Sequence, residues 1–257
     1  MGSLDGKLAL VAGVANRRSI AWAVAKRLHD GGARLAFTYQ GERLEAAVRE
    51  LAGSVGSELV VPCDVTSDES LDAAFAAVSE GLGGLDLLVH SIAFARAENL
   101  EGRFTDTGRD DFALALDIST YSLVAMTRRA EPLMAARGGG SVVTMTYLGG
   151  ERAVPHYNVM GVAKAALDAS VRYLALELGR TGIRVNAVSA GPVRTLAARS
   201  IAGFADMERL ATERAPLGRM IDADDVGATA AFLLSDAARG ITGTVVYCDA
   251  GYHSVGM

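Results

Sequence analysis

Short apolar runs alternate with amphipathic stretches along the whole chain. The apolar runs predict seven strands: Leu8–Ala12, Arg34–Tyr39, Leu59–Pro62, Leu85–Ser91, Ser141–Tyr147, Arg184–Ser189 and Thr244–Cys248. Between them, apolar residues recur at helical spacing, as in Ile20, Val24 and Leu28. This alternation predicts an α/β fold, a Rossmann-type doubly wound sheet of about seven parallel strands with helices on both faces. Ligands of such sheets bind at the carboxyl ends of the strands, so residues just after strands are the candidate site residues.

Two long stretches carry the strongest helical pattern, Asp110–Arg137 and the segment from Asn158 to Gly179. The second is apolar around much of its circumference, which predicts packing on the sheet and a further contact with another subunit. The chain has 257 residues, and no stretch reads as a linker long enough to divide it. We therefore expect one domain over residues 1–257.

Composition narrows the possible partners. The chain has 25 Lys and Arg against 30 Asp and Glu, a net charge of −5, without a dense basic run, which argues against nucleic acid and anionic membranes. Cys63 and Cys248 lack metal-ligand or redox spacing, so we expect reduced packing residues and no metal site. No signal peptide or long apolar span follows the amino terminus, which favours a cytoplasmic protein.

The loop after the first strand is a candidate phosphate site. Gly13 permits a sharp turn, but Ala15 and Ala21 replace glycines of the usual G-x-G-x-x-G fingerprint. A helix beginning near Ala21 would still present backbone N–H groups to a pyrophosphate, and Ser19 could add a hydroxyl donor. Taken alone, this loop is a weak signal for a dinucleotide.

Three later strand ends add candidates for the same cofactor. After the second strand, Gln40 could bond a ribose hydroxyl, and Glu42 would repel the 2′-phosphate of NADPH; this favours NADH unless Arg17 or Arg18 outweighs the acid. After the third strand, Asp64 could accept from the adenine amino group while Val65 packs on the ring. After the fourth, Ser91 and Ile92 could line the nicotinamide ribose. The alternative interpretation makes Asp64 a helix cap and Ile92 a core residue.

Tyr157 and Lys164 carry the candidate chemistry. A helix turns about 100° per residue, so seven positions return the lysine to nearly the direction of the tyrosine, and both can serve one site. Short-chain dehydrogenases usually have Tyr-x-x-x-Lys, yet Met160 stands four before Lys164, and Tyr147 stands where those enzymes have a serine. Either the site is inactive or the phenol has moved to Tyr157. His29, His90 and His253 read as packing or surface residues.

The replacements at Met160 and Tyr147 argue against reduction of a ketone, which needs a proton donor at the carbonyl that receives the hydride. A conjugate reduction differs, because hydride adds to Cβ while charge develops on a more distant carbonyl oxygen. A displaced phenol such as that of Tyr157 suits that displaced oxygen.

The sequence resembles bacterial NADH-dependent enoyl-acyl-carrier-protein reductases over nearly its whole length. The resemblance rests on these motifs: Tyr147-Leu-Gly-Gly-Glu-Arg-Ala-Val-Pro-His-Tyr157-Asn-Val-Met-Gly-Val-Ala-Lys164, Gly13 with Ser19-Ile20, Phe37-Thr-Tyr-Gln40, His90-Ser-Ile92, and Ser189-Ala-Gly-Pro-Val-Arg-Thr195-Leu-Ala. It implies reduction of the trans-2 double bond of enoyl thioesters on acyl carrier protein, the last step of the fatty acid elongation cycle. It also implies a homotetramer.

The same resemblance implies roles for individual residues. Tyr157 would stabilise the enolate oxygen, Lys164 would hold the nicotinamide ribose, and Tyr147 would line the substrate and assist. Ala95 would touch the substrate, and residues 193–215 would form a mobile flap over the acyl chain. The expected NAD-binding set is Gly13, Ser19, Ile20, Gln40, Asp64, Val65, Ser91, Ile92, Lys164, Val193, Arg194, Thr195, Leu196 and Ala197.

Two other functions remain open on the sequence alone. One is a short-chain oxidoreductase acting on a ketone or alcohol, which Met160 and Tyr147 disfavour. The other is a nonenzymatic NAD-binding sensor or scaffold. Such a protein needs ribose contacts but no phenol on the substrate side, so Tyr157 counts against it.

Overall fold

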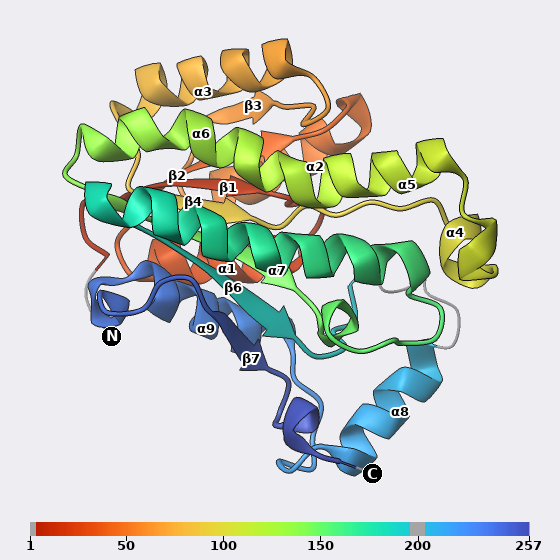
Figure 1. Ribbon diagram of the computed structural model, residues 1–257. Helices are drawn as coiled ribbons and strands as arrows, with labels where there is room; N and C mark the ends of the chain where they lie inside the picture. The colour runs from red at the N-terminus through yellow and green to blue at the C-terminus, as the bar shows by residue number, and fades with distance from the viewer. Residues whose placement is uncertain (1–3, 196–203, 257) are drawn as a thin grey trace.

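Seven parallel strands form a single sheet in the order β3-β2-β1-β4-β5-β6-β7 in the computed structural model, which describes residues 4–195 and 204–256 (Figure 1). The predicted strands are confirmed: β1 and β2 have the predicted bounds, and the ends of the others differ by at most two residues. The observed bounds are β1 Leu8–Ala12, β2 Arg34–Tyr39, β3 Val60–Pro62, β4 Leu87–His90, β5 Gly140–Thr146, β6 Ile183–Ala190 and β7 Val245–Cys248.

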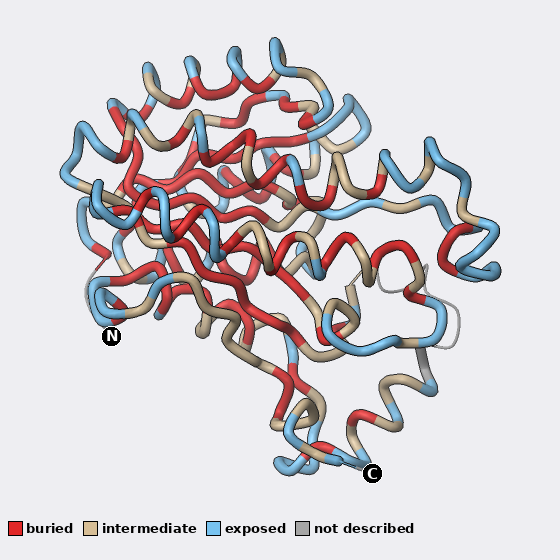
Figure 2. The backbone as a smooth tube through the Cα atoms, viewed as in Figure 1, coloured by how far each residue is buried: buried red, intermediate tan, exposed pale blue. Residues whose placement is uncertain are grey.

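Both faces of the sheet are covered by helices (Figure 1), and the strands lie in the buried interior (Figure 2). Alternate side chains of each strand belong to opposite cores. Val11 and Phe37 pack with α1 (Ile20–Asp30), α2 (Glu42–Ser54) and α9 (Ala223–Leu234). Leu10 and Ala36, one position earlier on the same strands, pack with α3 (Asp68–Leu82), α6 (Ser122–Ala135) and α7 (Asn158–Leu178). Burial on both faces explains why the strands read as continuous apolar runs.

The strand order reverses between β1 and β4, the position where ligands of doubly wound sheets bind. The loops that follow these two strands touch each other there. Gly13 has φ +102°, and a Cβ built on it would lie 2.0 Å from the carbonyl oxygen of Ser91. Glycine is therefore required by both the backbone angle and the close approach of the second loop.

The long helix predicted at Asp110–Arg137 is interrupted. It consists of α5 (Arg109–Leu116), a π-helical turn η2 (Asp117–Tyr121) and α6. In this turn Thr120 Oγ1 donates to the carbonyl of Ala163 on α7 at 2.8 Å, and Ser119 Oγ accepts from the N–H of Phe94 at 3.0 Å. The π turn is thus hydrogen-bonded both to the segment after β4 and to helix α7. Such turns are frequent at functional sites.

Two helices extend beyond the carboxyl ends of the strands, α4 (Glu98–Glu101) and α8 (Phe204–Arg214) (Figure 1). The described residues also contain short helical turns: η1 Phe104–Asp106, η3 Leu148–Gly150, η4 Gly179–Thr181, η6 Asp236–Ala238 and η7 Tyr252–Ser254. The predicted flap at 193–215 contains α8, its residues 196–203 lie outside the described part, and its mobility stays a prediction. Within the described ranges, no helix has the length and apolar character needed to cross a bilayer.

Candidate active site

Tyr157 lies at the carboxyl edge of the sheet, directly before the first residue of α7. Its side chain is buried, and its ring meets that of Tyr147 edge to face, with centroids 4.9 Å apart at 73°. Burial, with smaller contributions from Tyr147 and Asp168, raises the pKa of Tyr157 far above that of a free phenol. The hydroxyl therefore stays protonated at neutral pH and acts as a hydrogen-bond donor.

An apolar cluster holds the ring of Tyr157. Leu100, Met160 and Ala163 form its buried part with the tyrosine, and Ala95 and Tyr147 pack against them. Met160, which occupies the usual position of the catalytic tyrosine, is thus a core side chain. The expected substrate residues Ala95, Tyr147 and Tyr157 are brought together.

Lys164 is buried on the same helix, and its Nζ donates to the carbonyl oxygen of Met145 at 2.7 Å. Burial lowers the pKa of Lys164 to about 8, and the carboxylate of Asp168, one turn further on, partly offsets this. Asp168 has its own pKa raised, first by burial, while Thr146 and Lys164 act in the opposite direction. At neutral pH the lysine is an ammonium group in a largely water-free site.

His90 ends β4 below this site and bonds through both ring nitrogens. Nδ1 lies 2.8 Å from Thr144 Oγ1, and Nε2 lies 2.8 Å from Ser122 Oγ. Because Ser122 gives its proton to the carbonyl of Ile118 at 2.6 Å, it must accept from His90, which assigns the proton to Nε2. Burial, aided by the charge of Lys164, lowers the pKa of His90 to about 3. The neutral ring is a packing residue, in agreement with the sequence interpretation.

The loop between β1 and α1 is shaped by Ser19. Its Oγ accepts from the N–H groups of Ala15 and Asn16, each at 3.0 Å, so these two donors are used within the loop. Ile20 and Ala21 open α1, where backbone N–H groups have no carbonyl partner in the preceding turn. The donors best placed for a phosphate group are therefore those at Ile20 and Ala21, and Ser19 also supports the loop that presents them.

The expected adenosine contacts lie at two neighbouring strand ends. Gln40 is exposed after β2, and Asp64 follows β3, where its Oδ1 accepts from the N–H of Thr66 at 3.0 Å in a local turn. Asp64 is not the cap of α3, because Ser67 has that role. Arg17 pairs with Glu50 at 2.7 Å, so part of its charge is already neutralised near the expected ribose site.

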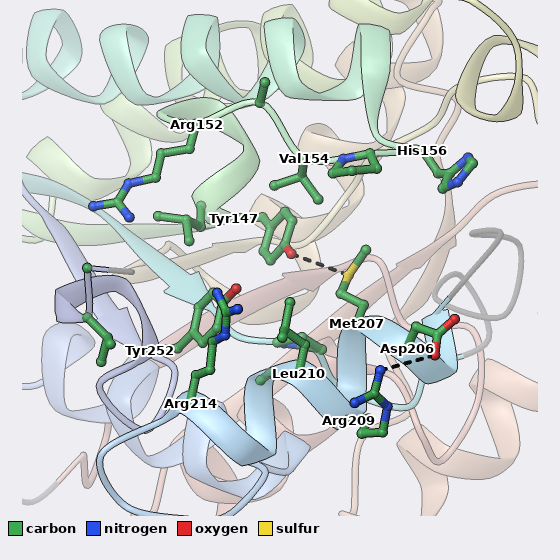
Figure 3. Close-up of a pocket in the computed structure, with 17 residues that line it drawn as sticks. Tyr147, Arg152, Val154, His156, Asp206, Met207, Arg209, Leu210, Arg214 and Tyr252 are labelled. Atoms are coloured by element: carbon green, nitrogen blue, oxygen red, sulfur yellow. Dashed lines mark hydrogen bonds and ion pairs between the residues drawn. The ribbon is translucent and has the colours of Figure 1, made fainter.

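A cavity of about 490 Å³ opens in front of Tyr147 (Figure 3). Its walls come from the segment between β5 and α7, from α8 and from the carboxyl-terminal residues. Tyr147 points across it and donates to Met207 Sδ of α8 at 3.4 Å. Burial raises the pKa of Tyr147 to about 12, so this phenol is also neutral. The apolar lining consists of Leu148, Ala153, Val154, Pro155, Pro192, Met207, Leu210, Ala211, Tyr252 and Val255.

The remaining expected cofactor residues are placed only in part. Ser91 and Ile92 follow β4 beside Gly13, and Val65 is buried against the α3 side of the sheet. Val193 is buried after β6; Arg194, next to it, forms an ion pair with Glu208 of α8, and the N–H of Thr195 donates to Val193 O at 2.7 Å. Leu196 and Ala197 lie outside the described residues.

Sequence reasoning missed four residues of the site. Asp168 stands four positions after Lys164, a spacing that could have indicated it. Met207 and Tyr252 line the cavity from distant parts of the chain, and no local pattern signals either one. Asn158, next to Tyr157, bonds to α4 through contacts that sequence spacing does not reveal.

A parallel sheet of this order, with a phenol and a buried lysine at its carboxyl edge, defines a nucleotide-dependent oxidoreductase of the short-chain dehydrogenase type. Residues 13–253 match the family model described as Enoyl-(Acyl carrier protein) reductase. The chain belongs to this family. The model covers more than nine-tenths of the sequence, including every expected cofactor and substrate residue.

Individual relatives agree with the family over full lengths. The chain is 54% identical to the enoyl-(acyl-carrier-protein) reductase (NADH) FabI of Bacillus cereus, covering 100% of both proteins. A crystal structure of the Bacillus cereus reductase with NADP+ and indole naphthyridinone superposes with a TM-score of 0.96, at 53% identity and full coverage of both chains. The Anaplasma phagocytophilum reductase in complex with NAD gives a TM-score of 0.94 at 47% identity, over 100% of this chain and 96% of that chain.

Proposed function

We propose that this protein reduces the trans-2 double bond of enoyl thioesters carried on acyl carrier protein, using NADH. The observation that carries the proposal is the buried Tyr157 packed against the partly buried Tyr147 beside a cavity, with Met160 filling the usual tyrosine position. Membership of the enoyl reductase family supports the same reaction. It is the final reductive step of the fatty acid elongation cycle.

The proposed role of Tyr157 follows from its protonation state. When bound, NADH supplies the hydride that adds to Cβ of the substrate. Negative charge then develops on the thioester carbonyl oxygen, and a neutral phenol can donate a hydrogen bond to that oxygen. Because burial keeps Tyr157 protonated, it offers this donor without a prior proton transfer. Tyr147, packed against its ring, limits how the phenol can turn and lines the substrate cavity.

The chain's residues fit a bound dinucleotide. An ammonium group has three N–H donors, and Lys164 gives one to Met145 O, so two are available for ribose hydroxyls. The first turn of α1 offers N–H groups to the pyrophosphate, and Gly13 keeps that loop close to Ser91. Gln40 and Asp64 would contact the adenosine, with Val65, Ile92 and residues 193–197 along the remaining length.

The cavity is suited to the acyl chain and its thioester. Its walls are mainly aliphatic, which favours a hydrocarbon chain, and Tyr147 is among its lining residues (Figure 3). Arg209 and Arg214 of α8 stand among the lining residues, where a negatively charged carrier could be attracted. Arg209 is already engaged with Asp206 and Glu213, so its contribution to such a contact is limited.

One absorbance assay tests the reaction. NADH oxidation is followed after mixing the protein with a crotonyl or longer enoyl thioester, and in parallel with a β-ketoacyl thioester. Oxidation with the enoyl substrate alone is the expected result. Turnover of the β-ketoacyl thioester instead would indicate a carbonyl reductase, and NADH binding without any turnover would indicate a sensor.

The proposed assembly is a homotetramer. Tyr173 and Leu176 of α7 are 73% and 78% exposed in the single chain, although both are large apolar side chains on one helix. Such side chains are expected to be covered by a partner. Sedimentation should give four copies, and Leu176→Glu should dissociate them into smaller species. If the wild-type protein is a monomer, the proposed tetramer is wrong, but the proposed reaction is not contradicted.

The proposed location is the cytoplasm. Cys63 and Cys248 are both free in the structure. Unpaired thiols are typical of proteins in reducing compartments. Fractionation of the native host would test this location directly.

A further inference from the structure

The backbone on both sides of Tyr157 adopts an unusual conformation. His156 has φ +61° and Asn158 has φ +36°, in the left-handed region that side chains other than glycine rarely occupy. Among the described residues, Ala250 is the third and last non-glycine residue with positive φ. Two of the three therefore flank the proposed catalytic phenol. Such conformations persist only where surrounding contacts hold them.

Asn158 supplies those contacts. Its side-chain Nδ2 donates to the carbonyl of Leu100 at 3.0 Å and to the carbonyl of Gly102 at 2.8 Å. Both acceptors lie at the end of α4, where helix carbonyls lack partners within the helix. The amide orientation follows from these partners, because the opposite orientation would set an oxygen against two carbonyl oxygens.

This clamp connects Tyr157 to the wall of its own site. Helix α4 lies beside the start of α7 (Figure 1), and Leu100 packs in the buried cluster with Tyr157 and Met160. Asn158 directly follows Tyr157 in the chain, and its side chain bonds to the carbonyls of the residues before and after Glu101. One side chain thus links the backbone next to the phenol to α4.

We propose that Asn158 is a positioning residue for the reduction: its two hydrogen bonds to α4 hold the backbone that aims the Tyr157 hydroxyl at the substrate oxygen. The inference rests on the proposed role of Tyr157. Asparagine is suited to this task because it tolerates positive φ and its amide nitrogen carries two donor protons. Aspartate and glycine tolerate the same backbone angle, but neither can donate these bonds.

Two variants separate the clamp from the backbone angle. Asn158→Asp keeps size and backbone preference but replaces the donor with an acceptor that faces two carbonyl oxygens. Asn158→Gly removes the clamp without adding charge, and it relaxes the strained angle, so it remains informative if the aspartate variant folds poorly. Ala250→Gly is the matched control, since it relaxes a left-handed residue outside the segment that carries Tyr157.

The measurement is kcat per NADH-binding site, with sites counted by fluorescence titration so that unfolded protein does not contribute. A misplaced catalytic group commonly costs roughly 10- to 100-fold, and we expect a loss of this size in the Asn158 variants with an NADH Kd within about twofold of wild type. The isotope effect with NADH deuterated at the transferred position should be at least as large as in wild type. Ala250→Gly should retain the wild-type kcat.

A purely structural role gives a different result. Folded protein would then decrease while kcat per binding site stayed within about threefold of wild type, and this outcome overturns the inference. A greater loss of kcat per binding site also overturns the inference if the isotope effect is smaller than in wild type. The slow step would then lie outside hydride transfer. Wild type and Tyr157→Phe are run alongside. An inactive wild type refutes the proposed reaction, whereas an impaired Tyr157→Phe beside unimpaired Asn158 variants refutes this inference alone.

Discussion

NADH binding should weaken as the pH rises through about 8, the value to which burial lowers the pKa of Lys164. A lysine loses its proton as the pH exceeds its pKa, so the ammonium form dominates below this value and the neutral amine above it. The ammonium group has three donors, one of which bonds to Met145 O. The neutral amine has two, so one bond to the cofactor ribose is lost together with the positive charge.

The size of the effect follows from that single bond. A hydrogen bond from a charged donor contributes about 1.5 to 3 kcal/mol, which corresponds to roughly 10- to 150-fold in affinity. With a pKa near 8, about nine-tenths of the protein carries the ammonium form at pH 7 and about one-tenth at pH 9. The affinity should therefore begin to fall near pH 8 and should continue to fall above it, because the bond to the cofactor raises the pKa of Lys164 in the complex.

Fluorescence titration with NADH at intervals between about pH 6 and 10 measures the midpoint. Asp168→Asn should move it to lower pH, because the carboxylate of Asp168 raises the pKa of Lys164. Lys164→Met should bind weakly at every pH, without an inflection. Glu80→Gln removes an exposed carboxylate on α3 and should leave the midpoint unchanged. An affinity that stays constant up to pH 10, or an unchanged midpoint in Asp168→Asn, would refute the proposed role of Lys164.

Three further results are expected. Tyr157→Phe should lower kcat by about 10²-fold with NADH affinity retained, because only the hydroxyl donor is lost and the ring can keep its packing; kinetics equal to wild type would contradict this. Gly13→Ala should lower Tm and weaken NADH binding, since its Cβ would lie 2.0 Å from the Ser91 carbonyl oxygen, whereas Gly240→Ala, with open space around it, serves as control in the same melting experiment. Turnover should be faster with NADH than with NADPH, and the opposite preference would show that Arg17 or Arg18 outweighs Glu42.

The sheet was predictable from sequence because most of its strands are buried on both faces and read as apolar runs. β1 and β2 begin and end at the predicted residues, and Gly13 was identified as the turn at the end of β1. The family motifs also predicted residues of the site: Tyr157, Tyr147 and Ala95 were expected near the substrate, and they lie together in the structure. Local patterns and family motifs were therefore sufficient to predict those features that depend on residues close together in the sequence.

The π turn within the predicted Asp110–Arg137 helix was not predictable in this way. Its sequence has helical spacing, and the interruption goes with bonds to distant residues, from Thr120 to Ala163 and between Ser119 and Phe94. The Asn158 clamp also joins residues more than fifty positions apart. Such pairings depend on which segments the fold brings side by side, and spacing along the chain carries no record of them.

The position of the phenol has a different cause from the one that helical spacing suggested. A rotation of about 100° per residue would bring Tyr157 and Lys164 to one face only if Tyr157 were part of the helix that carries Lys164. In the structure α7 begins at Asn158, and Asn158 itself has φ +36°, so Tyr157 precedes the regular helix. The ring is instead held by Leu100, Met160 and Tyr147. Because packing against Leu100, Met160 and Tyr147 positions the ring, the proposed donor to the thioester oxygen does not depend on helical spacing from Lys164, the proposed cofactor ligand.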